Sequence, residues 1–200
     1  MTNIADQALR ATARMSWSGH VHRSHRPTQM GADARFSILS GGRWNIGLGD
    51  PDGRRPFPAL YTATSSLIST WERLRHLDEH SVDTMKTSLR TALSRLEVML
   101  PSVLDLRSPK QLGVDPDVLL RSDYEISQEI AAAAYDEGLA GLLVPTATGL
   151  GAADGDFNVV IFYETTGAST LVFAMSIPDA VPRSGTVIRV LGTEAPNLPP

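Results

Sequence analysis

The stretch SDYEISQEIAAAAYDEGLAGLLVP, residues 122–145, carries the two patterns that decide the fold. Its first part predicts a helix over residues 122–137, because Asp123 can cap the start and four consecutive alanines favour helix. Gly138 is typical of the residue that follows a helix end. The apolar run over residues 139–144 then predicts a buried strand, which ends at the next proline.

Three more strand candidates follow without a helical pattern between them, over residues 157–163, 170–177 and 186–191. They are rich in Val, Ile and Phe, which is typical of buried strands. Strands that gather late in the chain favour a mixed sheet in an α+β domain over a doubly wound parallel sheet, whose helices alternate with strands. The length of 200 residues fits one domain.

The first half of the chain predicts a short N-terminal helix, two strands separated by a loop, and a second helix that Thr64 or Ser65 can cap. The apolar face expected for this second helix consists of Leu67, Ile68, Trp71 and Leu74. Two further short strands are expected over residues 96–100 and 103–106, since Pro101 interrupts the pattern between them.

Composition excludes several classes of function. The net charge of −4 argues against nucleic-acid binding, which usually needs a basic excess. The absence of cysteine excludes disulfides, thiolate zinc sites and cysteine nucleophiles. No apolar run is long enough for a membrane span and the N-terminus lacks a signal-peptide pattern, so a soluble cytoplasmic protein is expected. Of the 18 basic residues only two are lysines, so almost every cation can make the two-pronged contact that phosphates prefer.

The segment Gly41-Gly42-Arg43-Trp44-Asn45, followed by Gly47, is the first candidate site. Two glycines allow close approach of the backbone to a ligand, and the arginine offers a guanidinium beside free amides, which suits an anion. The alternative is a simple turn with a solvated arginine. The segment is not a Walker loop, because the Lys-Ser/Thr ending is missing.

Tyr61 and Glu72 form the second candidate. Tyr61 lies on a predicted strand, and Glu72 lies near the boundary of the apolar face of the following helix. A carboxylate there can point into a cleft and bind ribose hydroxyls or stabilise positive charge. The alternative is a surface glutamate that pairs with His76 one turn further on.

His20, His22 and His25 suggest a metal site only weakly. The first two share one face of a predicted strand, but the nearest acidic residue, Asp33, lies beyond a turn. Catalytic zinc needs three convergent ligands with supporting partners, so no metal is expected.

Taken in order, these pieces resemble the RES domain, a bacterial family named for its Arg, Glu and Ser residues and known as the toxins of RES–Xre toxin–antitoxin pairs. The resemblance covers roughly residues 18–164, and its most specific motif is the Gly-Gly-Arg-Trp-Asn block. The other matching segments are Val21-His22-Arg23, Leu60-Tyr61-Thr62-Ala63-Thr64-Ser65, Glu72, Val103-Leu104-Asp105-Leu106, Gly141-Leu142-Leu143-Val144-Pro145 and Asn158-Val159-Val160-Ile161-Phe162.

The resemblance implies a fold like that of ADP-ribosyltransferase toxins, a split mixed sheet with flanking helices around an NAD⁺ cleft. With the helical spacing at the start of the chain and the proline-rich end, we expect an N-terminal helical extension over residues 1–17, a RES domain over residues 18–192 and a disordered tail over residues 193–200. The implied activity is cleavage of the nicotinamide–ribose bond of NAD⁺, most simply by inorganic phosphate to give nicotinamide and ADP-ribose-1″-phosphate, or by water. The alternatives are ADP-ribosylation of a protein and a degenerate domain that only binds a partner.

The family pattern also assigns roles to residues. It implies that Arg43, Glu72 and Tyr61 are catalytic, with Glu72 as the carboxylate that faces the reacting ribose. The residues that it implies bind NAD⁺ or phosphate are Arg23, Trp44 and Thr146. Thr146 stands where the family has its serine, so the hydroxyl is kept and a methyl is added. A role for His25 near the cleft mouth is a guess.

The implied partners are NAD⁺ and an Xre-like antitoxin that blocks the cleft, with no direct nucleic-acid or membrane contact and with a homodimer left open. The loop between Asn45 and Tyr61 is longer than in the family, with Asp50, Asp52, Arg54 and Arg55 added. We expect this insertion to lie over the pocket or at a partner surface.

Overall fold

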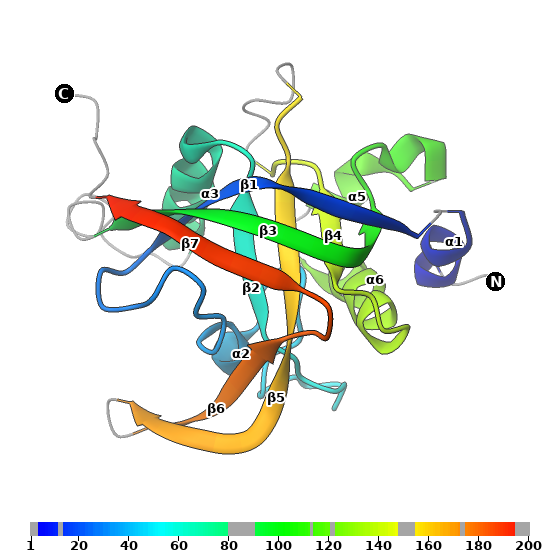
Figure 1. The fold of residues 1–200 in the computed structure, drawn as a ribbon. Helices are drawn as coiled ribbons and strands as arrows, with labels where there is room; N and C mark the ends of the chain where they lie inside the picture. Colours follow the sequence, from blue (N-terminus) through cyan, green and yellow to red (C-terminus); the bar gives the residue numbers. More distant parts are fainter. Residues whose placement is uncertain are drawn as a thin grey trace.

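The computed structural model describes residues 4–11, 14–79, 91–112, 114–120, 123–147, 155–172 and 175–194. Helices flank a sheet of long, twisted strands (Figure 1). In chain order the elements are α1 (Ile4–Ala11), β1 (Met15–His25), α2 (Ser37–Ser40), β2 (Ala59–Ala63), α3 (Ser66–Glu79), β3 (Ala92–Asp105), the 3₁₀ helix η1 (Pro109–Leu112), α5 (Pro116–Leu120), α6 (Glu125–Asp136), β4 (Gly141–Val144), β5 (Asn158–Val172), β6 (Met175–Pro182) and β7 (Val187–Glu194).

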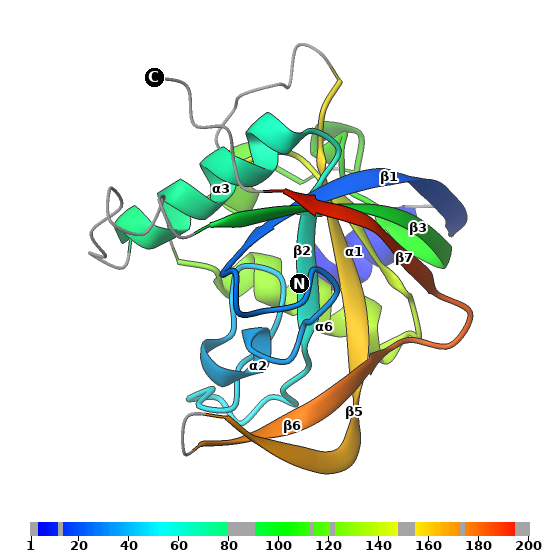
Figure 2. The same ribbon diagram turned by 60° about the vertical axis from the view of Figure 1, so that its left-hand side comes forward.

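The strands pair in a ring. β1 pairs with β2, β2 with β5, β5 with β4, β4 with β3, and β3 again with β1. The β3–β4 pair is parallel and the others are antiparallel, while β7 and β6 extend the sheet beside β3 and β5. In Figures 1 and 2 the strands β1, β3 and β7 cross over β2, β5 and β4 as a separate layer. The predicted α+β domain with a split mixed sheet is confirmed.

Residues of β5 alternate between two hydrophobic clusters. Val159 and Ile161 pack with β1 and β3 residues between the two layers of strands, whereas Val160 and Phe162 pack with residues of α1 and α6 on the other face. A strand that is covered on both faces has a continuous apolar sequence. This double burial explains why the run over residues 157–163 predicted a strand correctly.

Helix α6 presents a stripe of small and apolar side chains to the sheet. Its buried residues are Ser127, Ile130, Ala131, Ala134 and Tyr135. Gly138 follows the helix with φ of 80°, as its position predicted. The predicted cap was wrong, because Tyr124 occupies the capping position and no side chain caps the helix.

Two strand predictions are corrected by the pairing. The expected strands over residues 96–100 and 103–106 are one strand, β3, which continues through Pro101. Pro101 is tolerated because the β7 ladder ends at Met99 and the β1 register shifts between Met15 and Trp17, so that no regular ladder bond is required there.

The expected strand over residues 170–177 is the second correction. It combines the end of β5 with the start of β6, which pair antiparallel so that Val172 lies opposite Met175. The apolar composition of this segment is therefore that of two neighbouring strand ends rather than of one strand.

The expected apolar face of α3 is wrong in part. Leu67 and Trp71 are 60% and 46% exposed, and Ile68 is buried. The polar residues Ser69 and Glu72 take the inward position, because α3 covers a cavity rather than the hydrophobic core. The expected cap is confirmed for Ser65, whose Oγ accepts the Ile68 N–H at 3.2 Å.

The two ends of the described chain lie in α1 and β7. Helix α1 buries Ala5 and Ala8 in the cluster that contains α6 residues. Thr193 and Glu194, the first residues of the expected tail, belong to β7, and residues 195–200 lie outside the described residues. Among the helices of the described part, none has the length and apolar character to cross a membrane.

Candidate active site

A cavity of about 320 Å³ lies between α3, the end of β1, β2 and the loop that carries residues 41–45. Five of the six predicted site residues line it together, namely Arg23, Arg43, Trp44, Tyr61 and Glu72. Residues that are up to 49 positions apart in sequence therefore line one cavity. They come together because the strands pair in a closed ring.

Glu72 is held rigidly at the cavity wall. Its Oε1 accepts the Ala147 N–H at 2.6 Å and the Asn158 side-chain amide at 3.0 Å. Arg75 Nη1 lies 3.9 Å from Oε2. Asn158 is placed for this contact because it lies at the end of β5, opposite Ala63 on β2 and Val144 on β4. The carboxylate is thus fixed by donors from two other segments, as electrostatic catalysis requires.

Arg43 is buried rather than solvated. Its Nη1 donates to the Leu119 carbonyl at 2.8 Å, and its guanidinium carbon lies 4.5 Å from the ring centroid of Tyr124. The side chain is only 8% exposed. Contacts to a carbonyl and to an aromatic face orient the guanidinium at the cavity wall.

The Tyr61 hydroxyl makes hydrogen bonds to the motif loop, and the Tyr61 side chain lines the cavity. The hydroxyl donates to Asn45 Oδ1 at 2.8 Å and accepts the Trp44 N–H at 2.9 Å. Burial of the hydroxyl raises the pKa of Tyr61 well above its ordinary value of 10, although 37% of the side chain is exposed at the cavity. At neutral pH the phenol is therefore protonated and is not a general base.

Asn45 and Gln128 fix the loop from the other side. Asn45 is fully buried and donates to the carbonyls of Ser37 and Phe57, both at 3.0 Å. Gln128 on α6 donates to the Gly42 carbonyl at 2.9 Å. The motif loop is thus tied to the Ser37 and Phe57 carbonyls on one side and to α6 on the other.

The inserted loop does not lie over the cavity. Arg54 pairs with Asp50 at 2.6 Å and donates to Gln128 Oε1 at 3.0 Å, so the insertion packs against α6. None of the residues 50–58 that the structure describes lines the cavity. The insertion supports the motif loop from behind.

Gly47→Ala is expected to destabilise the protein by about 1–3 kcal/mol, a typical cost of overpacking. A Cβ on Gly47 would overlap the backbone nitrogen of Gly41, which has φ of 69° and little room to shift. The matched control is Gly49→Ala, because nothing lies within 4 Å of a Cβ there. Urea unfolding of both variants checks this, and equal midpoints for the two would contradict it.

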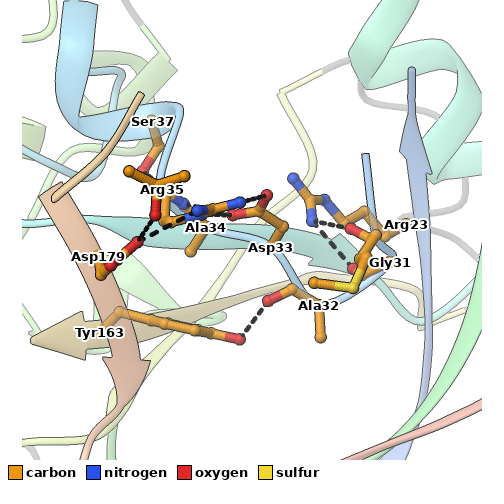
Figure 3. A network of polar contacts seen from close by, with 11 residues as sticks. Arg23, Gly31, Ala32, Asp33, Ala34, Arg35, Ser37, Tyr163 and Asp179 are labelled. Carbon is orange, nitrogen blue, oxygen red and sulfur yellow. Dashed lines mark hydrogen bonds and ion pairs between the residues drawn. The ribbon is translucent and has the colours of Figure 1, made fainter. Parts of the chain in front are cut away.

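Arg23 lies at the end of β1 and holds the next loop. Its Nη1 donates to the Gly31 carbonyl at 2.9 Å and to the Met30 carbonyl at 3.2 Å (Figure 3). On the far side of this loop the Tyr163 hydroxyl donates to the Ala32 carbonyl at 2.7 Å. Burial lowers the pKa of Arg23 to about 10, so the guanidinium stays charged at neutral pH.

An ion-pair network continues this loop away from the cavity. Burial acts to raise the pKa of Asp33, but two hydrogen bonds of 3.0 Å from the Arg35 guanidinium hold it below its ordinary value. Arg35 also reaches Asp179 on β6 at 3.2 Å (Figure 3). The network connects the loop at the cavity wall to β6, which pairs with β5.

Two predicted binding residues are placed differently from Arg23. Trp44 lines the cavity but is only 4% exposed, because its side chain packs in the core. Thr146 is buried and is not among the lining residues, although its neighbours Pro145 and Ala147 are. Both can act on the cavity through the backbone that they hold.

His25 lies outside the cavity. It is 2% exposed, with Nδ1 2.8 Å from the Arg26 carbonyl and Nε2 2.8 Å from Ser94 Oγ. Burial lowers its pKa below 6.5, helped by the nearby charges of Arg23 and Arg73. Its place beside β3 is structural, and the guess of a role at the cleft mouth finds no support in the cavity lining.

This burial predicts a pH dependence of stability. Because the unfolded state binds a proton at His25 more readily than the folded state, stability is full above about pH 6.5 and falls as pH drops toward the lowered pKa, by up to about 1.4 kcal/mol per unit. Urea unfolding between pH 7.5 and 5.5 should show this fall for the wild type and for His20→Gln, an exposed control. The same fall in His25→Gln would contradict the assignment.

Sequence reasoning missed Asn158, Arg73 and Arg75, all of which line the cavity. A signal existed for Asn158, which is the polar first residue of β5, directly before the buried apolar residues of that strand. The two arginines follow Glu72 on a helix whose inward face was misassigned. In the part of the chain that the structure describes, no three histidine or acidic side chains gather as metal ligands.

Comparison with known proteins agrees with this geometry. The model of the RES domain family matches residues 20–179. NAD(+) phosphorylase MbcT of Mycobacterium tuberculosis and that of Mycobacterium bovis are each 31% identical to the chain over 153 residues, which span 72% of this chain and 76% of the relative. The crystal structure of the M. tuberculosis MbcT–MbcA toxin–antitoxin complex matches with a TM-score of 0.63 and 22% identity over 90% of this chain and 92% of that chain. The protein therefore belongs to the RES domain family.

Proposed function

We propose that the protein degrades NAD⁺ by breaking the bond between nicotinamide and ribose. The MbcT relatives, which are named NAD(+) phosphorylases, support the substrate. The observation that carries the proposal is the Glu72 carboxylate, which two donors fix in a cavity that is lined by several arginines. A fixed anion beside cationic side chains suits a substrate with two phosphates and a developing positive charge on its sugar.

The chemistry assigns Glu72 the central role. When the bond breaks, nicotinamide leaves as a neutral molecule and the ribose acquires oxocarbenium character. A carboxylate that is already oriented by Ala147 and Asn158 stabilises this charge without reorganising. Glu72 can also accept a hydrogen bond from a ribose hydroxyl.

The other residues position the substrate. Arg43 and Arg23 bind phosphate oxygens, because guanidinium groups make two-pronged contacts with them. Tyr61 offers its ring to nicotinamide or its ribose, while its hydroxyl holds the motif loop. Trp44 and Thr146 contribute through the backbone on either side of the cavity, since both side chains are buried.

We further propose that inorganic phosphate is the acceptor. A phosphate oxygen bonds to C1″ as the C1″–N bond breaks, and the electron pair of that bond leaves with nicotinamide. The products are nicotinamide and ADP-ribose-1″-phosphate, so no oxidant or metal is needed.

We also propose an antitoxin partner of the Xre-like type that covers the cavity mouth. The M. tuberculosis relative is seen in a toxin–antitoxin complex. An enzyme that consumes NAD⁺ harms the cell that makes it unless a partner inhibits it. Because this substrate is present in the cytoplasm, we propose that the protein acts there. Toxicity that persists unchanged when the neighbouring gene product is co-expressed would contradict this partner.

The acceptor is tested with labelled NAD⁺. Purified protein should release nicotinamide faster as phosphate is added, and the label should stay in a small molecule when a cell lysate is present. Release that is indifferent to phosphate would indicate hydrolysis instead. A discrete labelled protein band would indicate ADP-ribosylation.

A further inference from the structure

Two of the buried polar atoms that lack a hydrogen-bond partner among the described residues lie beside Arg23 at the cavity. They are Nε of Arg73 and Oγ of Ser24, and both residues line the cavity. Unpaired buried donors are costly and are uncommon in folded proteins. Because both residues belong to the cavity wall, a ligand that accepts hydrogen bonds can satisfy these atoms once their side chains turn toward it.

The surroundings of Arg73 are electropositive. Its pKa is lowered first by burial and then by the charge of Arg26. The pKa of Arg23 is lowered by burial and, to a smaller extent, by the charge of Arg73. Asp33, the acidic group nearest to Arg23 on this loop, is already engaged by Arg35. Positive charge therefore accumulates at this part of the wall, where an anion would relieve it.

Three hydrogen bonds hold this part of the cavity wall together. The Ser24 N–H donates to Ser69 Oγ at 2.8 Å, which ties the end of β1 to α3. Ser69 and Arg73 are four residues apart on α3 and so share a face of the helix. Arg23 is held by two loop carbonyls. These contacts hold the Arg23 guanidinium and the Ser24 backbone at the part of the cavity wall that Arg73 also lines.

We propose that Arg73 and Ser24, beside Arg23, form an oxyanion subsite that binds a phosphate group. Guanidinium N–H and hydroxyl O–H groups both donate to phosphate oxygens, and the charged donors give the stronger bonds. The phosphate comes either from free inorganic phosphate or from the diphosphate of NAD⁺. The inference rests on the proposed function only for the identity of these two sources.

The test compares Arg73→Gln with Arg10→Gln, which removes the same charge from an exposed position on α1. For wild type and both variants, KM is measured for phosphate and for NAD⁺. We expect Arg73→Gln to raise one KM about tenfold or more and Arg10→Gln to leave both unchanged. A rise for phosphate alone identifies the acceptor as the occupant, and a rise for NAD⁺ alone identifies the diphosphate. Unchanged values for both in Arg73→Gln would overturn the subsite.

A binding measurement separates this proposal from the proposed function. Calorimetric titration with inorganic phosphate needs no turnover, and titration with NAD⁺ is done in the Glu72→Gln background. Loss of binding of either molecule on adding Arg73→Gln supports the subsite even if the protein proves not to cleave NAD⁺. Unchanged binding of both, in a protein that does cleave NAD⁺, would overturn the subsite and leave the function standing.

Thermal unfolding distinguishes a binding role from a structural one. Arg73→Gln should melt at the same temperature as the wild type or higher, because the substitution removes a buried N–H donor that lacks a partner. Added phosphate or NAD⁺ should raise the melting temperature of the wild type more than that of Arg73→Gln. A lower melting temperature for Arg73→Gln, with an undiminished ligand response, would show that the residue is structural and would refute the proposal.

Ser24→Ala should weaken the binding of the same ligand about threefold to tenfold, equivalent to the ~1 kcal/mol of one hydrogen bond.

Discussion

Glu72→Gln is expected to lower the rate of NAD⁺ cleavage by about 10²–10³-fold, the loss seen when one electrostatic contact to a transition state is removed. Glutamine keeps the size of the side chain and can still accept the Ala147 N–H. It lacks the negative charge that stabilises the oxocarbenium-like ribose. The effect should therefore fall on kcat, with little change in the KM for NAD⁺. Nicotinamide release measured over a range of NAD⁺ concentrations gives both quantities.

The matched control for this variant is Glu125→Gln, which makes the same change at an exposed position at the start of α6. Its kinetics should equal those of the wild type. Both variants should unfold at urea concentrations close to that of the wild type, which shows that the fold is intact. A Glu72→Gln protein that retains more than about a tenth of the wild-type kcat, against the expected 10²-fold loss, would remove Glu72 from its central role.

Asn45→Ala is expected to cost about 3–5 kcal/mol of stability, at about 1–3 kcal/mol for each buried group left without a partner. The fully buried amide donates to the carbonyls of Ser37 and Phe57, and its oxygen accepts the Tyr61 hydroxyl. Alanine leaves the two carbonyls and the Tyr61 hydroxyl without these hydrogen bonds. Since domains are commonly stable by only about 5–15 kcal/mol, the variant should be close to unfolding at ambient temperature.

Urea unfolding at constant m-value measures this loss. Tyr61→Phe is the graded comparison, because it removes the hydroxyl and leaves the two carbonyl contacts of Asn45 in place; it should cost about 1–2 kcal/mol. Its ring still lines the cavity, so its activity should fall less than that of Glu72→Gln. An Asn45→Ala variant within about 1 kcal/mol of the wild type, below the cost of one unpaired buried group, would show that the network is not what holds the motif loop.

The α+β class could be predicted because the decisive strands carry strong local signals. The β5 sequence is apolar at consecutive positions, since two clusters cover its opposite faces. Pro101 misled the prediction because a proline usually ends a strand, and only the register shift beside it shows why β3 continues. Pairing partners far apart in sequence decide such cases, and local patterns do not contain them.

The candidate site could be predicted in part for a similar reason. Arg43, Tyr61 and Glu72 were identified by the order of motifs, which carries information about the family. Arg73 was missed because the apolar pattern of α3 placed Leu67 and Trp71 inside, whereas the helix turns its polar face to the cavity. A helix that covers a cavity reverses the usual relation between hydrophobicity and burial.

The most direct test of the account is phosphorus NMR of NAD⁺ incubated with purified protein and inorganic phosphate, with nicotinamide measured in the same sample. We expect the diphosphate signals to persist and a sugar 1-phosphate signal to grow in an amount equal to the nicotinamide released. NAD⁺ that remains intact while the folded protein binds it would contradict the central claim that this cavity cleaves the nicotinamide–ribose bond.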